Sequence, residues 1–368
     1  MLEFIRIQRF KTLLDASFPL ASLNIFSGLN GMGKSTVLQA LLLLRQSYES
    51  NTLFSRGLRL KGDYVALGTG KDVLAEQAEL NTIEFLLTWE GISPANFSFN
   101  YDTKSDLQPL NEHINLQAPE ELSLFNHCFQ YLSANRIVPK NFYEVSDYFI
   151  RDLNSLGNQG EYTANFIAEN GSKPISLKTL KHPKATTSNL LENLDKWMAE
   201  LSPGLRIHVK NQPEINAVSL GYAYEYGKEV TADFSPQNVG FGLTYVLPIV
   251  TELLRAKDGD MVIIENPESH LHPAGQAIIG RMCAIAALGG VQLFVETHSD
   301  HFLNGVRIAI KEKLIQPDFV RLFFLERGPN AGIHSSRVLS PMMDEEGRLD
   351  SWPKGFFDEW DNELERLL

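Results

Sequence analysis

The sequence predicts an α/β fold in which helices pack on a mixed β-sheet, and two stretches of the chain support this prediction. Residues 2–7 and 23–27 are rich in β-forming residues, and the second run leads directly into a glycine-rich loop and an apolar helical segment. Later in the chain, the strand-like runs at 261–265 and 291–296 alternate with helical segments. Strands that alternate with helices are typical of a parallel or mixed sheet covered by helices.

The elements between these two stretches are shorter and less regular. The two N-terminal strands are expected to flank a polar turn over residues 11–15, and VLQALLLLRQSY at 37–48 is expected to form a buried helix. Residues 60–135 contain short strand-like runs separated by turns. Residues 140–232 are more polar, with one amphipathic helix expected at 188–201. The sequence has no long heptad repeat, so we expect no long coiled-coil arm.

This pattern divides the chain into four consecutive segments. We expect an N-terminal lobe at 1–139, an insertion at 140–232, a C-terminal lobe at 233–340 and a C-terminal cap at 341–368. The two lobes carry the motifs described below. The cap contains the aromatic and acidic run WPKGFFDEWDNELERLL, which suits a small contact surface.

The overall composition is that of an ordinary globular protein. The chain has 368 residues, of which 43% are hydrophobic and 21% are charged, and its formal net charge is −12. A negative charge of this size repels nucleic acid and anionic membranes on average, so the charge indicates neither as a partner. The two cysteines are far apart, and no apolar run has the length of a membrane span. These features favour a cytoplasmic location.

Gly28 to Ser35 matches the phosphate-binding pattern G-x-x-x-x-G-K-[ST]. The backbone N–H groups of such a loop, together with the positive end of the following helix, attract phosphate oxygens. Lys34 is expected to bridge the β- and γ-phosphates of ATP, and Ser35 is expected to bind Mg²⁺. The predicted ATP-binding residues are Asn30, Gly31, Met32, Gly33, Lys34, Ser35 and Thr36.

A second glycine pattern, NVGFGLT at 238–244, precedes the strand at 261–265. It places Gly240 and Gly242 at the start of a helix, where free backbone N–H groups form a second anion site. Glycines at a helix start are also common as packing devices. The position of the pattern just before an acid-tipped strand favours the anion site. Pro248 is expected to kink this helix.

The strand at 261–265 ends in Glu265, and Asn266 and Glu268 follow. A strand-end acid beside a phosphate-binding loop suits Mg²⁺ binding through water, and we assign this role to Glu265. Asn266 can orient a water molecule but cannot accept a proton. Two outcomes stay open: Glu268 acts as a displaced general base, or the site has no base and turnover is intrinsically slow. In both cases turnover is expected below the ~10 s⁻¹ typical of enzymes.

His298 follows the next strand, at 291–296. A single histidine after a strand is often structural. Side chains at the carboxyl ends of neighbouring parallel strands converge, however, and the neighbouring strand here ends in Glu265. This position favours a catalytic role for His298.

These motifs resemble, in their order, the head of an ABC-type ATPase of the SMC/RecF/OLD-like group. They are GLNGMGKST at 28–36, NVGFGLT at 238–244, MVIIENPESHLHP at 261–273 and ETHSDH at 296–301. Within this group, VGFGLTYVLPIV, ENPESHLHPAGQ, ETHSDHFLNGVR and the tail WPKGFFDEW are similar to small bacterial AAA-type ATPases that end in a conserved domain of unknown function. Such ATPases are frequent in phage-defence gene neighbourhoods.

The resemblance implies a P-loop NTPase fold with an ABC-ATPase-like head, and a homodimer with two ATP molecules sandwiched between the heads. The loop at 28–36 of one subunit would hold the nucleotide, and a trans segment of the other subunit would cap its γ-phosphate. The residues of this trans segment are Asn238, Gly240, Gly242 and Thr244. His298 would sense the same phosphate.

Three features differ from the pattern of those heads. The trans segment lacks the usual serine–glycine–glycine form. The segment YLSANRIVP at 131–139 occupies the place of the Q-loop without a glutamine, so Arg136 is the candidate substitute. The usual aspartate–glutamate pair is Glu265–Asn266, so an amide replaces one of the two carboxylates.

The sequence therefore predicts a slow ATP hydrolase that uses ATP and Mg²⁺ and regulates an anti-phage defence complex. It would control a separate effector encoded nearby, such as a nuclease. Two alternatives stay open. A DNA-repair ATPase of the SMC/RecF type would act on DNA directly, and a metal-dependent hydrolase would use the acids and histidines of the last two motifs. The candidate metal ligands for that hydrolase are Glu265, Glu268, His270, His272, His298, Asp300 and His301.

The basic segment at 173–184 and the helix at 188–201 lie outside the motif-bearing lobes. They are therefore the candidates for contact with a partner protein. A solvated loop is the simpler interpretation of the basic segment. Its basic residues are Lys173, Lys178, Lys181, His182 and Lys184.

Overall fold

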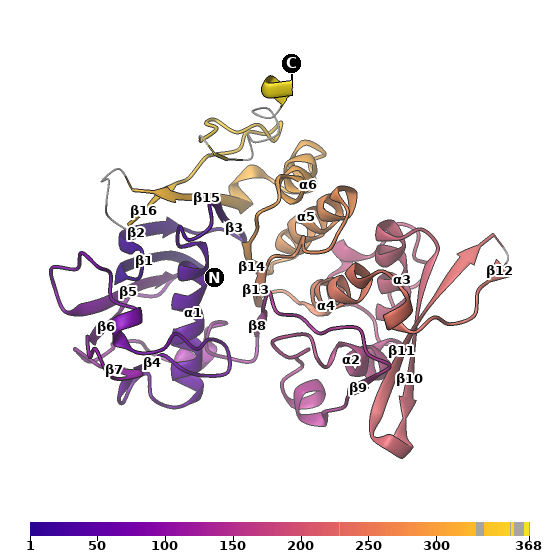
Figure 1. Cartoon of the computed structure of the whole chain (residues 1–368), viewed down its shortest axis with the longest axis horizontal. Helices are drawn as coiled ribbons and strands as arrows, with labels where there is room; N and C mark the ends of the chain where they lie inside the picture. The colour runs from indigo at the N-terminus through magenta and orange to yellow at the C-terminus, as the bar shows by residue number, and fades with distance from the viewer. Residues whose placement is uncertain (228, 329–334, 354, 357–363, 368) are drawn as a thin grey trace. The chain divides into compact units, whose positions relative to one another are not determined.

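The protein is represented by a computed structural model that describes residues 1–227, 229–328, 335–353, 355–356 and 364–367. Its strands and helices confirm the predicted α/β class (Figure 1). The chain forms two compact units. The first contains residues 1–129, 318–344 and 348–368, and the second contains residues 130–317 and 345–347. This grouping does not test the four consecutive segments, which stay a prediction.

The first unit begins with an antiparallel sheet of strand order β2-β1-β5-β6. Its strands are β1 (Leu2–Phe10), β2 (Leu13–Pro19), β5 (Thr82–Trp89) and β6 (Ala95–Asn100). The expected turn over 11–15 is too long, because Leu13 already pairs with Phe10 and β2 starts there. Buried Ala16 and Phe18 alternate with exposed neighbours, which is the pattern of a half-buried strand.

A mixed sheet in the same unit carries the glycine-rich loop. Strand β3 (Leu23–Gly28) runs parallel to β15 (Val320–Arg327), and β16 (Ser336–Leu339) pairs with β15 in the antiparallel direction. The ring of Phe26 on β3 stacks on that of Phe323 on β15, with centroids 5.2 Å apart. Helix α1 (Lys34–Glu49) follows the loop, and β4 (Gly57–Arg59) pairs with β7 (Leu107–Pro109).

In the second unit, β13 (Met261–Glu265) and β14 (Gln292–Glu296) form a parallel pair joined by α5 (Pro273–Leu288). Helix α6 (Asp300–Lys311) follows β14 and lies beside α5 (Figure 1). Two glycines allow these helices to touch. A Cβ on Gly280 of α5 would lie 2.1 Å from the carbonyl oxygen of Phe302, and one on Gly305 of α6 would lie 2.0 Å from that of Ala277.

Helix α4 (Phe241–Arg255) is tied to the start of β13 by a buried ionic network. The Arg255 guanidinium lies 2.6 Å from Glu252 and 3.4 Å from Asp260, and all three side chains are at most 2% exposed. Burial raises the pKa of Asp260, and the charge of Arg255 opposes this shift. The network fixes the far end of α4 to the strand that ends in Glu265.

The remainder of the second unit contains a second sheet and two more helices. Its elements are β9 (Phe142–Glu144), α2 (Thr163–Asn170), α3 (Leu190–Leu201), β10 (Leu205–Gln212), β11 (Ala217–Tyr226) and β12 (Glu229–Val230). Strand β8 (Phe129–Leu132) spans the boundary of the two units. The longest helices in the described part of the chain have 16 residues, so it contains no long coiled coil.

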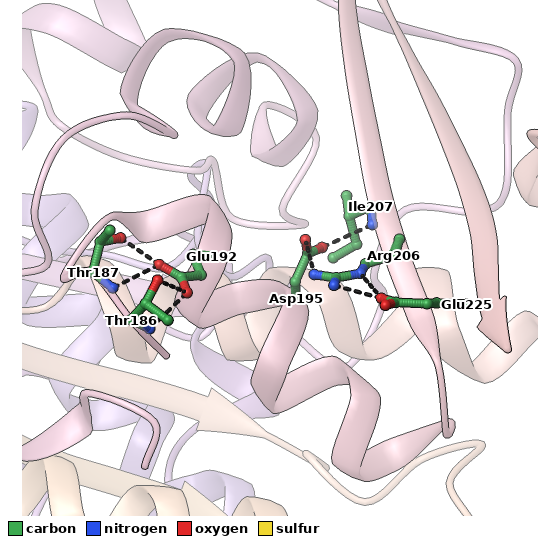
Figure 2. Close-up of polar contacts among 7 residues, drawn as sticks. All are labelled: Thr186, Thr187, Glu192, Asp195, Arg206, Ile207 and Glu225. Carbon is green, nitrogen blue, oxygen red and sulfur yellow. Dashed lines mark hydrogen bonds and ion pairs between the residues drawn. The ribbon is translucent and has the colours of Figure 1, made fainter. Parts of the chain in front are cut away.

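Polar contacts hold α3 to the segments before and after it (Figure 2). Glu192, in the first turn, accepts hydrogen bonds from the backbone N–H and hydroxyl groups of Thr186 and Thr187. Asp195 accepts the N–H of Ile207 at 2.8 Å. Arg206 on β10 pairs with Asp195 and with Glu225 of β11. The structure confirms the expected helix, with a start two residues later than the sequence predicted. No helix in the described ranges has both the length and the apolarity of a membrane span.

Candidate functional site

The glycine-rich loop connects β3 to α1 in the first unit, as the sequence predicts. Gly28, Gly31 and Gly33 have φ angles of 140°, 76° and 86°, which are in the region that favours glycine. A Cβ on Gly33 would lie 2.4 Å from the hydroxyl oxygen of Thr12. The loop therefore needs glycine for both its backbone conformation and its close packing.

Lys34 begins α1, and its side chain turns back over the loop. Its ammonium group donates hydrogen bonds to the carbonyl oxygens of Gly28 and Leu29, at 2.8 and 2.9 Å. The residue is 4% exposed. A buried ammonium group beside the positive end of a long helix attracts an anion. Asn30 and Gly31 are exposed at the tip of the loop.

Glu265 ends β13, and its carboxylate accepts hydrogen bonds from a segment more than a hundred residues earlier. The hydroxyl of Tyr131 donates to Oε1 at 3.1 Å, and the backbone N–H of Ala134 donates to Oε2 at 2.9 Å. Burial and the negative charge of Glu265 raise the pKa of Tyr131. The hydroxyl therefore keeps its proton and remains a donor. Both oxygens of Glu265 have a fixed protein donor.

Arg136 lies beneath the same strand end and is 3% exposed. Its Nη2 donates to the carbonyl oxygen of Glu265, and its Nη1 donates to that of Asn266 at 3.2 Å. Its Cζ lies 4.9 Å from the ring centroid of Tyr245 on α4, and the Tyr245 hydroxyl donates to the carbonyl oxygen of Ala134. Arg136 thus holds backbone rather than a carboxylate in this structure.

Glu268 is held by the segment that follows β14. Its Oε2 accepts the Thr297 hydroxyl at 2.8 Å, and its Oε1 accepts the backbone N–H of His298 at 2.7 Å. Burial raises the pKa of Glu268, while these hydrogen bonds and the charge of Arg136 partly oppose the shift. A carboxylate with a raised pKa that is fixed by two donors is suited to accept a proton.

Asn266 connects these two acids through an unusual backbone conformation. Its φ is 43°, in the left-handed region that asparagine tolerates better than most residues. Its N–H donates to the carbonyl oxygen of Glu296 at 2.8 Å. Its Oδ1 is buried and accepts no hydrogen bond from the described residues. The acceptor capacity of this amide oxygen is therefore not used by any described residue.

The glycines of the predicted trans segment line a cavity of about 260 Å³ in the second unit. Gly240 is the N-cap of α4, and a Cβ on it would meet no atom within 4 Å. A Cβ on Gly242 would lie 2.3 Å from the carbonyl oxygen of His270. The N-termini of α4 and α5 both border the cavity, with His272 as the N-cap of α5. The positive ends of two helices make this cavity suitable for an anion.

The other predicted residues lie in different surroundings. Asn238 is exposed and does not line the cavity. Thr244 is fully buried, and its hydroxyl lies 3.3 Å from that of Tyr222, so its side chain has a packing role. His298 is exposed and lies two residues beyond the end of β14. Its backbone N–H donates a hydrogen bond to Glu268.

The seven candidate ligands of the alternative metal-dependent hydrolase do not assemble into one centre. Among the residues that the structure describes, no group of three or more histidines, cysteines, aspartates or glutamates could hold a metal ion. His270 instead packs edge-on against Phe241 and Tyr245, with centroids 4.8 and 4.9 Å apart. His301 lies 3.6 Å from Asp300, its neighbour in the sequence.

Sequence reasoning missed several residues of the acid-bearing site. They are Tyr131, Ala134, Tyr245 and Thr297. Ala134 acts through its backbone, which leaves no trace in residue type. The other three are common core residues, and only the fold brings them to this site. The sequence analysis assigned the segment 131–139, with Arg136, to the place of the Q-loop. It did not predict which groups of this segment contact the acids.

The basic segment at 173–184 is partly a solvated loop. Its four lysines are exposed, but His182 is 4% exposed and packs edge-on against Trp197 of α3 at 4.8 Å. Burial lowers the pKa of His182. Lys184 borders a surface cavity of about 470 Å³ together with α3 and the ends of β10 and β11. Both partner-contact candidates therefore adjoin one cavity.

Two family models match the chain. A model described as "AAA domain, putative AbiEii toxin, Type IV TA system" matches residues 23–304. A model described as "Protein of unknown function (DUF3696)" matches residues 315–367. The first match includes the four motifs at 28–36, 238–244, 261–273 and 296–301, and the second includes the tail at 352–360.

One curated relative and one solved structure extend this result. The chain is 24% identical over 333 residues to an OLD nuclease of Thermus scotoductus, and the match covers 83% of the chain and 60% of the relative. A crystal structure of an Smc head bound to the C-winged helix domain of ScpA has a TM-score of 0.51 and 14% identity, and covers 94% of the chain and 98% of that head. At this identity the similarity shows the fold, which is that of a P-loop NTPase head.

Proposed function

This chain belongs to the AAA domain family matched over residues 23–304, and we propose that it is an ATP-gated switch that hydrolyses ATP slowly as a homodimer. The observation that carries the proposal is the arrangement of the two acids. Glu265 is fixed by Tyr131 and Ala134, while Glu268 is fixed on the segment of His298. One acid can bind a hydrated cation, and the other can accept a proton.

The phosphate-binding loop would hold ATP, with Lys34 on the β- and γ-phosphates. Mg²⁺ would be held by the Ser35 hydroxyl and by Glu265. Because both oxygens of Glu265 already accept a protein hydrogen bond, its chemistry fits a cation held through water better than direct ligation. When bound, Mg²⁺ would neutralise the charge that develops on the phosphate oxygens.

Glu268 is the best candidate for the general base. Asn266 cannot accept a proton, but its buried, unpartnered Oδ1 can accept a hydrogen bond from the attacking water and so orient it. Glu268 lies two residues further on, and burial raises its pKa toward the range in which a carboxylate is an effective base. His298, whose amide fixes Glu268, would sense the γ-phosphate.

The glycine-lined cavity supports a role for a second subunit. Its borders include two helix N-termini and Gly240, where a built Cβ would meet no atom within 4 Å. We infer that the γ-phosphate held by one subunit enters this cavity of the other. An ATP molecule would then be sandwiched between two heads, and slow hydrolysis would keep that state long-lived.

We also propose a place in antiviral defence, which rests on the resemblance of the motifs to small bacterial AAA-type ATPases of phage-defence gene neighbourhoods. The description of the matched family names a toxin, and the name of the relative is that of a nuclease. The match covers 60% of the length of that relative. We propose that nuclease chemistry belongs to a separate effector. The exposed lysines of 173–184, the helix α3 and the cavity of about 470 Å³ are the proposed contact surface for that effector.

A DNA-acting ATPase is the second candidate, because the relative is a nuclease and the solved neighbour is an Smc head. The formal charge of −12 weighs against it. Purified protein distinguishes the two. The switch is expected to dimerise with Mg²⁺ and ATP without DNA and to turn over below ~10 s⁻¹. A protein that stays monomeric with ATP but binds DNA in a salt-dependent manner would contradict the switch and favour the alternative.

A further inference from the structure

Tyr245 connects the glycine-rich start of α4 to the loop that holds Glu265. It lies three residues after Gly242 and is 8% exposed. Its hydroxyl donates to the carbonyl oxygen of Ala134, and the N–H of Ala134 donates to Glu265 at 2.9 Å. One residue thus receives a hydrogen bond from α4 and donates another to the carboxylate. Hydrogen bonds linked in series reinforce one another.

Packing through His270 links the first turn of α4 to Tyr245. The ring of His270 packs edge-on against both Phe241 and Tyr245, at 4.8 and 4.9 Å. On the same turn, a Cβ on Gly242 would lie 2.3 Å from the carbonyl oxygen of His270. Because close-packed groups shift together, a displacement of the helix start moves the Tyr245 side chain as well.

The Arg136 guanidinium contacts the Tyr245 ring and also binds the end of β13. Its Cζ lies 4.9 Å from the ring centroid, and its two terminal nitrogens donate to the carbonyl oxygens of Glu265 and Asn266. A planar guanidinium can lie over an aromatic ring and at the same time donate hydrogen bonds to two acceptors. A lysine ammonium cannot do both. Burial lowers the pKa of Arg136, but a guanidinium in a protein keeps its charge.

We propose that Tyr245 and Arg136 are positioning residues that link the glycine-lined cavity to the orientation of the Glu265 carboxylate. The proposal rests on the proposed function, because the second subunit is what would act on the cavity. Engagement presses on the first turn of α4, and the Tyr245 hydroxyl moves with it. The N–H of Ala134 then reorients Glu265, so hydrolysis is favoured in the engaged dimer.

Three variants of the full chain test this link. Tyr245→Phe removes one hydroxyl and keeps the ring, with its contacts to the Arg136 guanidinium and to the edge-on His270 ring. Arg136→Lys keeps the positive charge and removes the pair of guanidinium nitrogens that donate to the two carbonyl oxygens. Tyr143→Phe is the matched control, because Tyr143 is 3% exposed and its hydroxyl also bonds to backbone, accepting the N–H of Lys140 at 3.0 Å.

The first measurement is steady-state ATP hydrolysis. Tyr245→Phe is expected to lower kcat about 3- to 10-fold, the effect of one hydrogen bond, with KM unchanged. Arg136→Lys is expected to lower kcat on the order of 10²-fold, because a misplaced site loses about that much. Tyr143→Phe is expected to retain the parental rate. A Tyr245→Phe rate equal to that of the control would overturn the link.

The second measurement does not depend on turnover. Hydrogen exchange of the amides at 131–136 is followed with and without a non-hydrolysable ATP analogue and Mg²⁺. In the parent, the analogue is expected to slow this exchange about 3-fold or more. In Tyr245→Phe that protection is lost, while the amides at 28–36 stay protected. Equal protection of 131–136 in both proteins would contradict the proposal. If the parent shows no protection at 28–36 and no turnover, the proposed function fails, and the link fails with it.

Discussion

The phosphate-binding loop and the acid-bearing site are built in opposite ways. The loop takes its shape from nine consecutive residues, 28–36, in which the glycines set the backbone and Lys34 bonds to carbonyls five and six positions earlier. The acid-bearing site gathers groups from 131–136, α4, the end of β13 and the segment after β14. Local construction suits a site that binds an invariant phosphate. A site assembled from distant segments changes when those segments move, so its activity can depend on the conformation of the protein.

The largest effect is expected from a substitution that changes the loop and leaves both acids in place. Lys34→Ala is expected to reduce hydrolysis about 10²-fold or more and to weaken ATP binding strongly, since it removes the point charge on the β- and γ-phosphates. Calorimetric titration and a phosphate-release assay measure the two losses. Parental turnover in the folded variant would remove the loop from the ATP site.

The two glycines of the trans segment sharpen the comparison, because their surroundings differ. Gly240 has no atom within 4 Å of a built Cβ, so Gly240→Asp is expected to fold and to bind ATP in the monomer. The added carboxylate should still block ATP-dependent dimerisation by facing the γ-phosphate. Light scattering with and without ATP measures this effect. A variant that dimerises as readily as its parent would contradict the trans role.

Gly242→Ala is the matched contrast. Its Cβ would lie 2.3 Å from the carbonyl oxygen of His270, so the turn must shift. We expect a loss of about 1–3 kcal/mol in the free energy of unfolding, which Gly240→Asp should not share. Urea titration of both variants separates a folding defect from a defect in assembly.

A pH profile tests the two acids without changing the loop. Burial raises the pKa of Glu268 above the ~4.3 of an exposed glutamate. A general base works when ionised, so kcat is expected to be present above this pKa and to fall as the pH decreases through it. In Glu268→Gln this decrease should be absent. An identical acid limb in both proteins, with the fold intact by circular dichroism, would assign the decrease to another group.

The smallest expected effect lies outside both sites, at the start of α3. Four hydrogen bonds from Thr186 and Thr187 lower the pKa of Glu192 to about 2 (Figure 2). The stabilisation is therefore present above the unfolded pKa of about 4.3 and is lost as the pH falls toward 2. Glu192→Gln is expected to lower Tm at neutral pH and to match its parent at the acidic end. Glu214→Gln, on the exposed turn between β10 and β11, is the control.

The same contrast explains how much the sequence could predict. The α/β class, α3, β13 and β14 follow from periodicity and composition, and the loop follows from a pattern of eight residues. The hydroxyl of Tyr245 and the N–H of Ala134 could not be predicted. A core tyrosine and an alanine carry no mark of function. The series of hydrogen bonds from Tyr245 to Ala134 and from Ala134 to Glu265 depends on how α4 and 131–136 pack. The extra strand β2 was missed because a short polar stretch near residue 12 hid the pairing of Phe10 with Leu13.

The central claim is that the acids, and not the loop, limit how long the ATP-bound state lasts. The most direct measurement is single-turnover hydrolysis by Glu268→Gln and its parent at saturating ATP and Mg²⁺. The account predicts equal ATP affinity, a parental rate below ~10 s⁻¹ and at least a 10-fold slower rate in the variant. Glu265→Gln should in addition lose its dependence on Mg²⁺. Hydrolysis by Glu268→Gln at the parental rate would contradict the claim, because Glu268 would then be a structural residue held by Thr297 and His298.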